Sequence, residues 1–176
     1  TRFNIVNLQS LDLEEQLKEL TFDMVICFNP SNSTLFNQTV LHTGKLVLIA
    51  PKDQSPKEGV FKLSTIKDEP FIKIKNLKTN QAQNNLDEVL AREGIRVNWI
   101  AETETIQVAK AMVEKGSGYS IIDDFSAKIY GESISIREIE PSIGYEICMI
   151  SNKEKPLSVN AKSFISYLEG VASDSN

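Results

Sequence analysis

The chain has 176 residues, of which 41% are apolar and 24% charged, a composition typical of a globular protein with a buried core. Its net charge is −5 and its isoelectric point about 5.0, which argues against nonspecific binding of nucleic acid by this chain. No apolar run approaches the roughly 20 residues that a membrane-spanning helix needs, and no signal peptide opens the chain, so a cytoplasmic protein is expected.

The first half of the chain alternates between predicted strands and helices. Apolar runs at residues 3–8 and 22–28 predict strands, and the leucine spacing of residues 11–20 predicts a helix with its leucines on one face. Two further extended runs, 40–42 and 45–50, are separated by Gly44. The polar stretch that follows, residues 51–59, contains two prolines and indicates a passage between two lobes.

The second half continues this alternation. A strand at residues 70–74 and a helix at 80–93 are followed by a strand at 97–101. Thr103 offers a hydroxyl to cap the next helix, whose predicted inward face is apolar and consists of Ile106, Val108, Ala109, Met112 and Val113. That helix ends at Lys115 and Gly116, and the next strand starts at Tyr119. A helix that joins two strands makes a right-handed crossover, so these strands are expected in a parallel sheet.

The last part of the chain contains four predicted elements. They are a short helix at residues 123–130, a strand with alternating character at 134–139, an apolar strand at 145–150 and a closing helix at 157–168.

Four segments resemble the effector-binding domain of LysR-type transcriptional regulators. The clearest is a helix end with Val113, Gly116 and Gly118, followed by an apolar strand with Tyr119, Ile121 and Ile122. The other three occur in the expected order and spacing: residues 22–26, residues 46–51, and a closing segment with Pro156, Leu157, Ser158, Ala161, Phe164, Ile165 and Leu168.

The resemblance implies an α/β, two-lobed, periplasmic-binding-protein-like fold. Each lobe is then a mixed sheet flanked by helices, and two crossover segments, near Pro51–Asp53 and Gly144–Tyr145, join the lobes. The first lobe would contain residues 1–51 and 146–176, and the second lobe residues 52–145. The family's DNA-binding domain, and the first strand and helix of its effector domain, have no counterpart in these residues, so the first lobe is expected to be incomplete.

By the same resemblance, the chain is expected to sense ligands for a bacterial transcriptional regulator and not to be an enzyme. A small metabolite would bind in the cleft between the lobes, and the full-length protein would contact DNA through the absent domain. Self-association is expected through the helices at 11–20 and 104–115. The alternative that remains open is a solute-binding protein of a transport system.

Three loops are candidates for ligand contact because each follows a strand or begins a helix at the edge where ligands of α/β sheets bind. The candidate residues are Phe28 and Asn29 in the first loop, Thr79, Asn80 and Gln81 in the second, and Thr103 and Thr105 in the third. The alternative role for the threonines is helix capping. The ligand is expected to carry a carboxylate bound near residues 79–81, since helix amides and three lysines favour an anion there. Those lysines, Lys73, Lys75 and Lys78, also fit a solvated loop, whereas Glu102 and Glu104 disfavour an anion at the third site.

Catalytic and metal-binding patterns are not found in the sequence. His42 is the single histidine, so a catalytic triad would have to include it, and a surface or packing role is the simpler interpretation. Cys27 and Cys148 lie in apolar strands, far apart in the sequence, and no metal ligand set or cofactor is expected. The two cysteines are interpreted as buried, reduced thiols, with a disulfide or redox role as the alternative.

Overall fold

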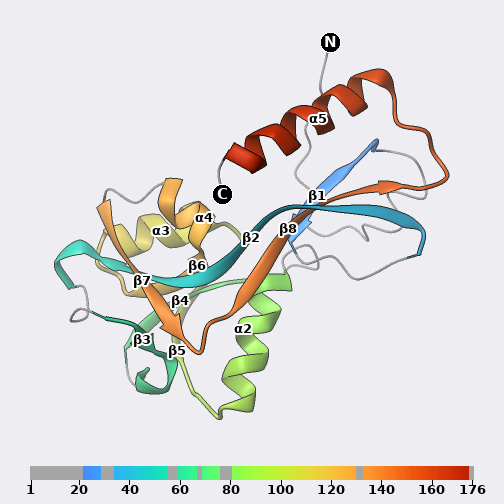
Figure 1. Ribbon diagram of the computed structural model, residues 1–176. Coiled ribbons are helices and arrows are strands. Elements are labelled where there is room, and N and C mark those ends of the chain that lie inside the picture. The colour runs from blue at the N-terminus through green and yellow to red at the C-terminus, as the bar shows by residue number, and fades with distance from the viewer. Residues whose placement is uncertain are drawn as a thin grey trace. The chain divides into compact units, whose positions relative to one another are not determined.

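The computed structural model describes residues 22–28, 34–54, 59–66, 69–75, 81–129 and 133–174. The strand predicted at 3–8 and the helix at 11–20 lie outside them. Contacts divide the chain into two compact units, with β1 (Val25–Phe28) and α5 (Val159–Asp174) in the first and β3 to β7 in the second. The strands β2 (Phe36–Pro51) and β8 (Gly144–Asn152) each run through both units, and the division falls after Thr43 and after Tyr145 (Figure 1).

The strand β2 is a single strand, although the sequence predicted two runs separated by Gly44. Its second half belongs to the second unit, because residues 46–49 pair with β6 and residues 47–51 pair with β7. The sequence prediction assigned this segment to the first lobe and placed the crossing near Pro51–Asp53. The polar, proline-containing stretch therefore marks the end of β2, and the change of unit occurs earlier, inside the strand.

The described part of the first unit contains the antiparallel pair β1 and β8, in which Val25 faces Ile150 and Cys27 faces Cys148. Val25, Cys27 and Ile150 form a buried cluster with Phe36 of β2. The helix α5 starts at Val159, with the Ser158 hydroxyl accepting a hydrogen bond from the Ala161 amide at 3.1 Å, and it extends beyond the predicted end at residue 168.

The second unit is built on a mixed sheet in the order β2, β6 (Tyr119–Asp123), β4 (Pro70–Ile74) and β5 (Asn98–Thr103). The strand β7 (Ile134–Glu140) pairs with β2, and the short β3 (Phe61–Lys62) pairs with β7. β4 is parallel to both β5 and β6, whereas β2 is antiparallel to β6 and β7. The crossover from β5 to β6 therefore joins parallel strands, as predicted, with β4 between them.

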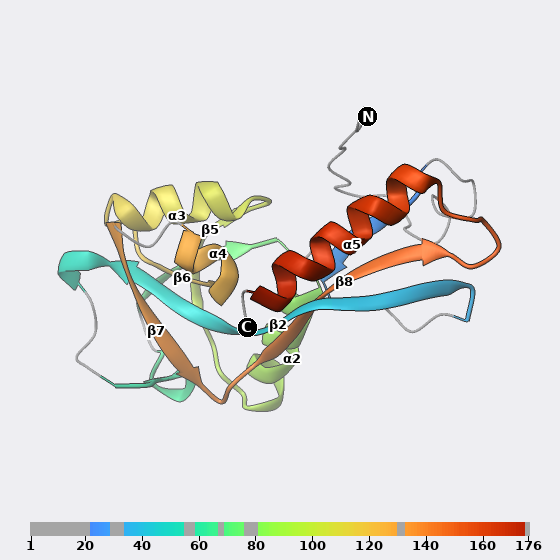
Figure 2. The same ribbon diagram turned by 45° about the horizontal axis from the view of Figure 1, so that its top comes forward.

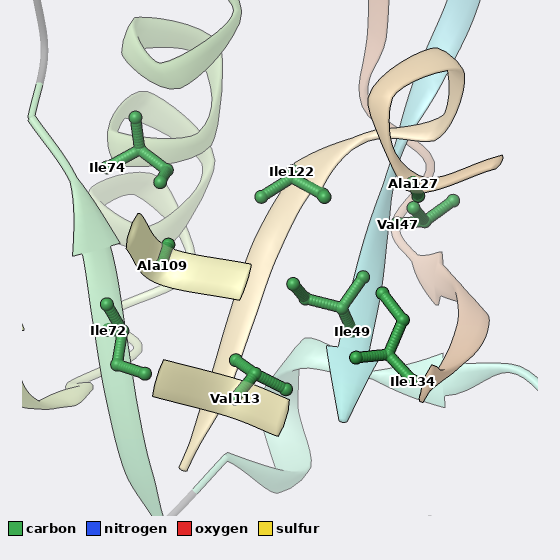
Figure 3. Packing of buried hydrophobic residues seen from close by; sticks show 9 residues of the cluster. All are labelled: Val47, Ile49, Ile72, Ile74, Ala109, Val113, Ile122, Ala127 and Ile134. Atoms are coloured by element: carbon green, nitrogen blue, oxygen red, sulfur yellow. The ribbon is translucent and has the colours of Figure 1, made fainter. Parts of the chain in front are cut away.

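Helices cover both faces of this sheet. α3 (Ile106–Glu114) and α4 (Asp124–Ile129) lie on one face and α2 (Gln81–Arg92) on the other (Figures 1 and 2). Figure 3 shows the core beneath α3 and α4, formed by Val47, Ile49, Ile72, Ile74, Ala109, Val113, Ile122, Ala127 and Ile134. Val108, predicted to face inward, is instead 49% exposed, so the buried face of α3 is narrower than its sequence suggested.

The short 3-10 helices η1 (Lys52–Gln54) and η2 (Leu63–Thr65) flank β3 along the chain. Among the described residues, no helix combines the length and the apolar character needed to cross a membrane.

The two glycines after α3 have separate structural reasons. Gly116 has a φ of 77°, and the amides of Gly116 and Ser117 donate to the carbonyls of Val113 and Met112 at 2.9 and 3.0 Å, which is a Schellman end to the helix. Gly118 passes so close to β4 that a Cβ atom there would lie 2.3 Å from the carbonyl oxygen of Pro70. The Gly-x-Gly pattern therefore ends one helix and permits the next strand to approach its neighbour.

Candidate functional site

The carboxyl ends of β4, β5 and β6 lie at one edge of the second unit's sheet, since these three strands are parallel. The chain continues there into Lys75 after β4, Glu104 after β5 and Asp124 after β6. Ligands of open α/β sheets bind beyond this edge, so its side chains define the candidate site in the second unit. Thr103 and Thr105, two of the predicted ligand residues, lie at this edge.

Both threonine hydroxyls at this edge contact nearby backbone. The Thr105 amide donates to the Thr103 hydroxyl at 3.3 Å, and the Thr105 hydroxyl accepts from the Val108 amide at 3.4 Å. Thr105 is therefore the N-cap of α3, and the prediction that Thr103 caps this helix is wrong. The reason is that β5 extends through Thr103, which delays the start of the helix.

The charges around the candidate site are partly paired. Lys75 Nζ lies 3.4 Å from Glu104 Oε1, and both side chains are about half exposed. Lys73 points elsewhere: its Nζ lies 2.9 Å from Asp87 Oδ2 on α2 and 5.5 Å from the centre of the Trp99 ring on β5. Lys73 therefore ties β4 to its neighbours, whereas Lys75 lies at the strand edge and is paired there with Glu104.

The remaining predicted residues fall in other places. Phe28 ends β1 in the first unit and is half-buried, while Gln81 is the first residue of α2. Asn29, Thr79 and Asn80 lie outside the described residues. Within the described ranges, no three His, Cys, Asp or Glu side chains gather closely enough to hold a metal ion.

A hydrogen-bonded cluster around Asp124 was missed by the sequence analysis. Asp124 Oδ1 accepts from the Tyr145 hydroxyl at 2.7 Å and from the Lys45 amide at 3.2 Å, and the Phe125 amide donates to the Tyr145 oxygen at 3.4 Å. A Cβ atom at Gly44 would lie 2.4 Å from Asp124 Oδ1. Within the second unit, the cluster thus joins Gly44 and Lys45 of β2 and Tyr145, near the start of β8, to Asp124 at the start of α4.

The electrostatic environment differs between the two adjacent aspartates. Burial raises the pKa of Asp123 above its ordinary value, against hydrogen bonds from Ser126, whose amide lies 2.7 Å from Asp123 Oδ1. Burial also acts to raise the pKa of Asp124, but hydrogen bonds from Tyr145 and Lys45, together with Lys128, outweigh it and lower the pKa. Burial and the bond to Asp124 raise the pKa of Tyr145. The capping role of Asp123 could have been predicted, because an aspartate directly before a helix is a common N-cap. The bond between Asp124 and Tyr145 could not, because no local sequence pattern indicates a partner 21 residues away.

Comparison with known proteins identifies the family to which the chain is similar. Residues 1–173 match the model of the family described as LysR substrate binding domain. No curated protein matches the chain in sequence. The regulatory domain of CcmR from Synechocystis PCC6803, solved in complex with 2-PG, is 19% identical with a TM-score of 0.77, over 91% of this chain and 78% of that one.

Two further solved structures have a similar fold. The effector binding domain of QuiR in complex with shikimate is 21% identical with a TM-score of 0.75, over 92% of this chain and 77% of that one. CbnR, a LysR family transcriptional regulator, is 18% identical with a TM-score of 0.71 over 88% of this chain, which spans 54% of the CbnR chain. The predicted periplasmic-binding-protein-like fold is confirmed. The chain belongs to the LysR substrate binding domain family.

Proposed function

We propose that this chain is the ligand-sensing domain of a LysR-type transcriptional regulator and binds a small metabolite that controls the full-length protein. The observation that carries the proposal is the match of residues 1–173 to the LysR substrate binding domain. Solved relatives that contain 2-PG and shikimate support a small-molecule effector. The family match disfavours the alternative of a solute-binding protein for transport. The same proposal includes two further parts: the domain senses its ligand and does not act as an enzyme, and the protein is located in the cytoplasm.

The proposed ligand contacts are Phe28, Asn29, Thr79, Asn80, Gln81, Thr103 and Thr105. Support comes from the placement of Thr103 and Thr105 where β5 meets α3, at the carboxyl edge of parallel strands. The Thr105 hydroxyl accepts from the Val108 amide and keeps its proton and one lone pair for a ligand. The Thr103 hydroxyl also donates to the Thr105 carbonyl at 3.4 Å, so its remaining lone pair can accept from a donor group of the ligand. The proposed ligand carries a carboxylate, for which Lys75 and the amides at the start of α2 supply positive charge.

The test is a screen of carboxylate metabolites by thermal shift, followed by affinity measurements on a hit with Thr103→Val and Asn80→Ala. Loss of one hydroxyl contact is expected to weaken binding by about 0.5–1.5 kcal/mol, up to roughly tenfold. Thr65→Val is the matched control, because the Thr65 hydroxyl donates to the Lys62 carbonyl at 2.6 Å on η2, away from the strand edge. If the affinity of a bound metabolite is unchanged by both site substitutions, this placement of the ligand is wrong.

The same proposal includes self-association through α3 and the segment of residues 11–20. The outer side of α3 carries Val108, which is 49% exposed, beside the exposed Gln107 and Ala111. Val108→Glu is expected to weaken a dimer in sedimentation experiments, whereas Val60→Glu, at a residue 50% exposed near β3, is the control. DNA binding is assigned to a separate domain of the regulator, so a mobility-shift assay with this acidic chain should show no specific retention.

A further inference from the structure

Cys27 and Cys148 are direct partners on neighbouring strands, although they lie far apart in the sequence. β1 and β8 pair antiparallel, and their register places Cys27 opposite Cys148. Directly facing residues of an antiparallel pair project from the same face of the sheet, with Cα atoms about 4.5–5.5 Å apart. Disulfides form across Cα separations of about 4.4–6.8 Å, so the backbone already meets their main geometric requirement.

Both cysteines are free thiols and both are buried, with 4% of Cys27 and 0% of Cys148 exposed. Cys27 packs in the apolar cluster of the first unit. Cys148 has polar neighbours: its Sγ accepts from Gln38 Nε2 at 3.4 Å and donates to Glu146 Oε2 at 3.8 Å. The two side chains are therefore largely shielded from solvent, and the strand register holds them beside each other.

We propose that Cys27 and Cys148 form a reversible disulfide site, oxidised by exchange with a low-molecular-weight disulfide. One cysteine, as its thiolate, attacks a sulfur of the small disulfide, breaks its S–S bond and releases one small thiolate. The other cysteine loses its proton to solvent and attacks the protein sulfur of the mixed disulfide, which releases the second small thiolate. Two protein thiols are thereby oxidised and one small disulfide is reduced to two thiols.

Folding favours this bond. In the unfolded chain, closing the long loop between the two cysteines costs conformational entropy, whereas in the folded chain β1 and β8 already hold them together. The equilibrium constant for disulfide formation should thus be on the order of a hundredfold larger in the native than in the unfolded chain.

The acid–base state of the pair determines the rate. Burial raises the pKa of Cys27 to about 12, and the neighbouring Cys148 adds to the shift. Burial also raises the pKa of Cys148, as does the Glu146 carboxylate, against the hydrogen bond from Gln38. Thiolates are scarce at neutral pH, so the native pair should exchange slowly and faster as the pH rises.

The experiment equilibrates the chain in mixtures of reduced and oxidised glutathione at mildly alkaline pH, with and without urea. Free thiols are then trapped by alkylation and disulfide-linked peptides are mapped. The native chain should link Cys27 to Cys148 with an equilibrium constant on the order of a hundredfold above that in urea, and its thermal midpoint should rise until dithiothreitol is added. Cys27→Ser and Cys148→Ser should show neither effect.

A second variant tests the register itself. Combining Cys27→Ser with Ile26→Cys moves the thiol by one residue to the opposite face of β1, where Ile26 is 48% exposed and faces Met149. This variant should form no intramolecular link to Cys148 in the native state. The proposal is overturned if the native chain links its cysteines no more readily than the unfolded chain, or if the moved thiol links equally well.

Discussion

The Tyr145 hydroxyl donates a 2.7 Å hydrogen bond to Asp124 Oδ1, which ties the end of β8 in the second unit to the first turn of α4. Removing it with Tyr145→Phe keeps the ring but leaves the carboxylate with one partner fewer in a partly buried place. The free energy of unfolding, measured with urea, should fall by about 1 kcal/mol.

Lys128→Ala is the control for this substitution. Lys128 contacts the other oxygen of the same carboxylate at 3.4 Å, but its side chain is 74% exposed. Loss of such a surface ion pair should change the free energy of unfolding by less than about 0.5 kcal/mol. Equal effects of the two variants would show that the tyrosine hydroxyl contributes no more than a surface contact.

Gly44→Ala should destabilise the second unit. The added Cβ would lie 2.4 Å from Asp124 Oδ1 and 2.5 Å from the Tyr145 oxygen, so the cluster must move to make room. A loss of about 1–3 kcal/mol is expected in urea unfolding. Gly170→Ala in α5 is the matched control, because, apart from the adjoining backbone of α5, no atom of the described residues lies within 4 Å of its added Cβ, and it should gain about 0.5–1 kcal/mol. Similar behaviour of the two variants would disprove the close approach at Gly44.

Substitutions at Asp123 can separate the effect of its capping hydrogen bond to α4 from the effect of its negative charge. Asp123→Asn keeps an oxygen for the Ser126 amide, whereas Asp123→Ala removes it and should cost about 1 kcal/mol. Because burial raises the folded-state pKa of Asp123 above 3.8, its favourable contribution is complete below pH 3.8 and is lost as the pH rises through the folded value. The stability of Asp123→Asn relative to the unmodified chain should therefore increase from acid to neutral pH. A constant difference between them would contradict the raised pKa.

The raised pKa of the Cys27 thiol predicts that the free energy of unfolding falls at alkaline pH under reducing conditions. Its pKa is 9.0 ordinarily and about 12 in the folded chain, so its contribution is complete below pH 9.0 and is lost between these values. Urea unfolding across this range should show a smaller decline for Cys27→Ala than for the unmodified chain. The slope is the diagnostic quantity, since the truncation also lowers stability at every pH. An identical slope would mean that the thiol ionises as readily in the fold as in the unfolded chain.

Local sequence determined most of the secondary structure in the described residues. The helix at 80–93 and the strands at 70–74 and 134–139 were predicted within about two residues, because apolar periodicity and end signals act over a few neighbouring positions. The pattern of Val113, Gly116 and Gly118 also pointed to the family that residues 1–173 match. Gly116 ends the helix through local backbone bonds, which the pattern encodes, whereas the requirement for glycine at Gly118 comes from the approach to Pro70 of β4.

Tertiary structure decided what depends on partners distant in the sequence. Gly44 resembled a break between two strands, but the reason for glycine there is the approach of Asp124 and Tyr145. The change of unit inside β2 depends on pairing with β6 and β7, which no composition of the stretch at 51–59 encodes. Cys27 and Cys148 were two separate apolar residues in the sequence and became facing neighbours only through strand register. Periodicity reports which face of an element is buried, whereas the pairing of faces and registers is set by the whole chain's packing.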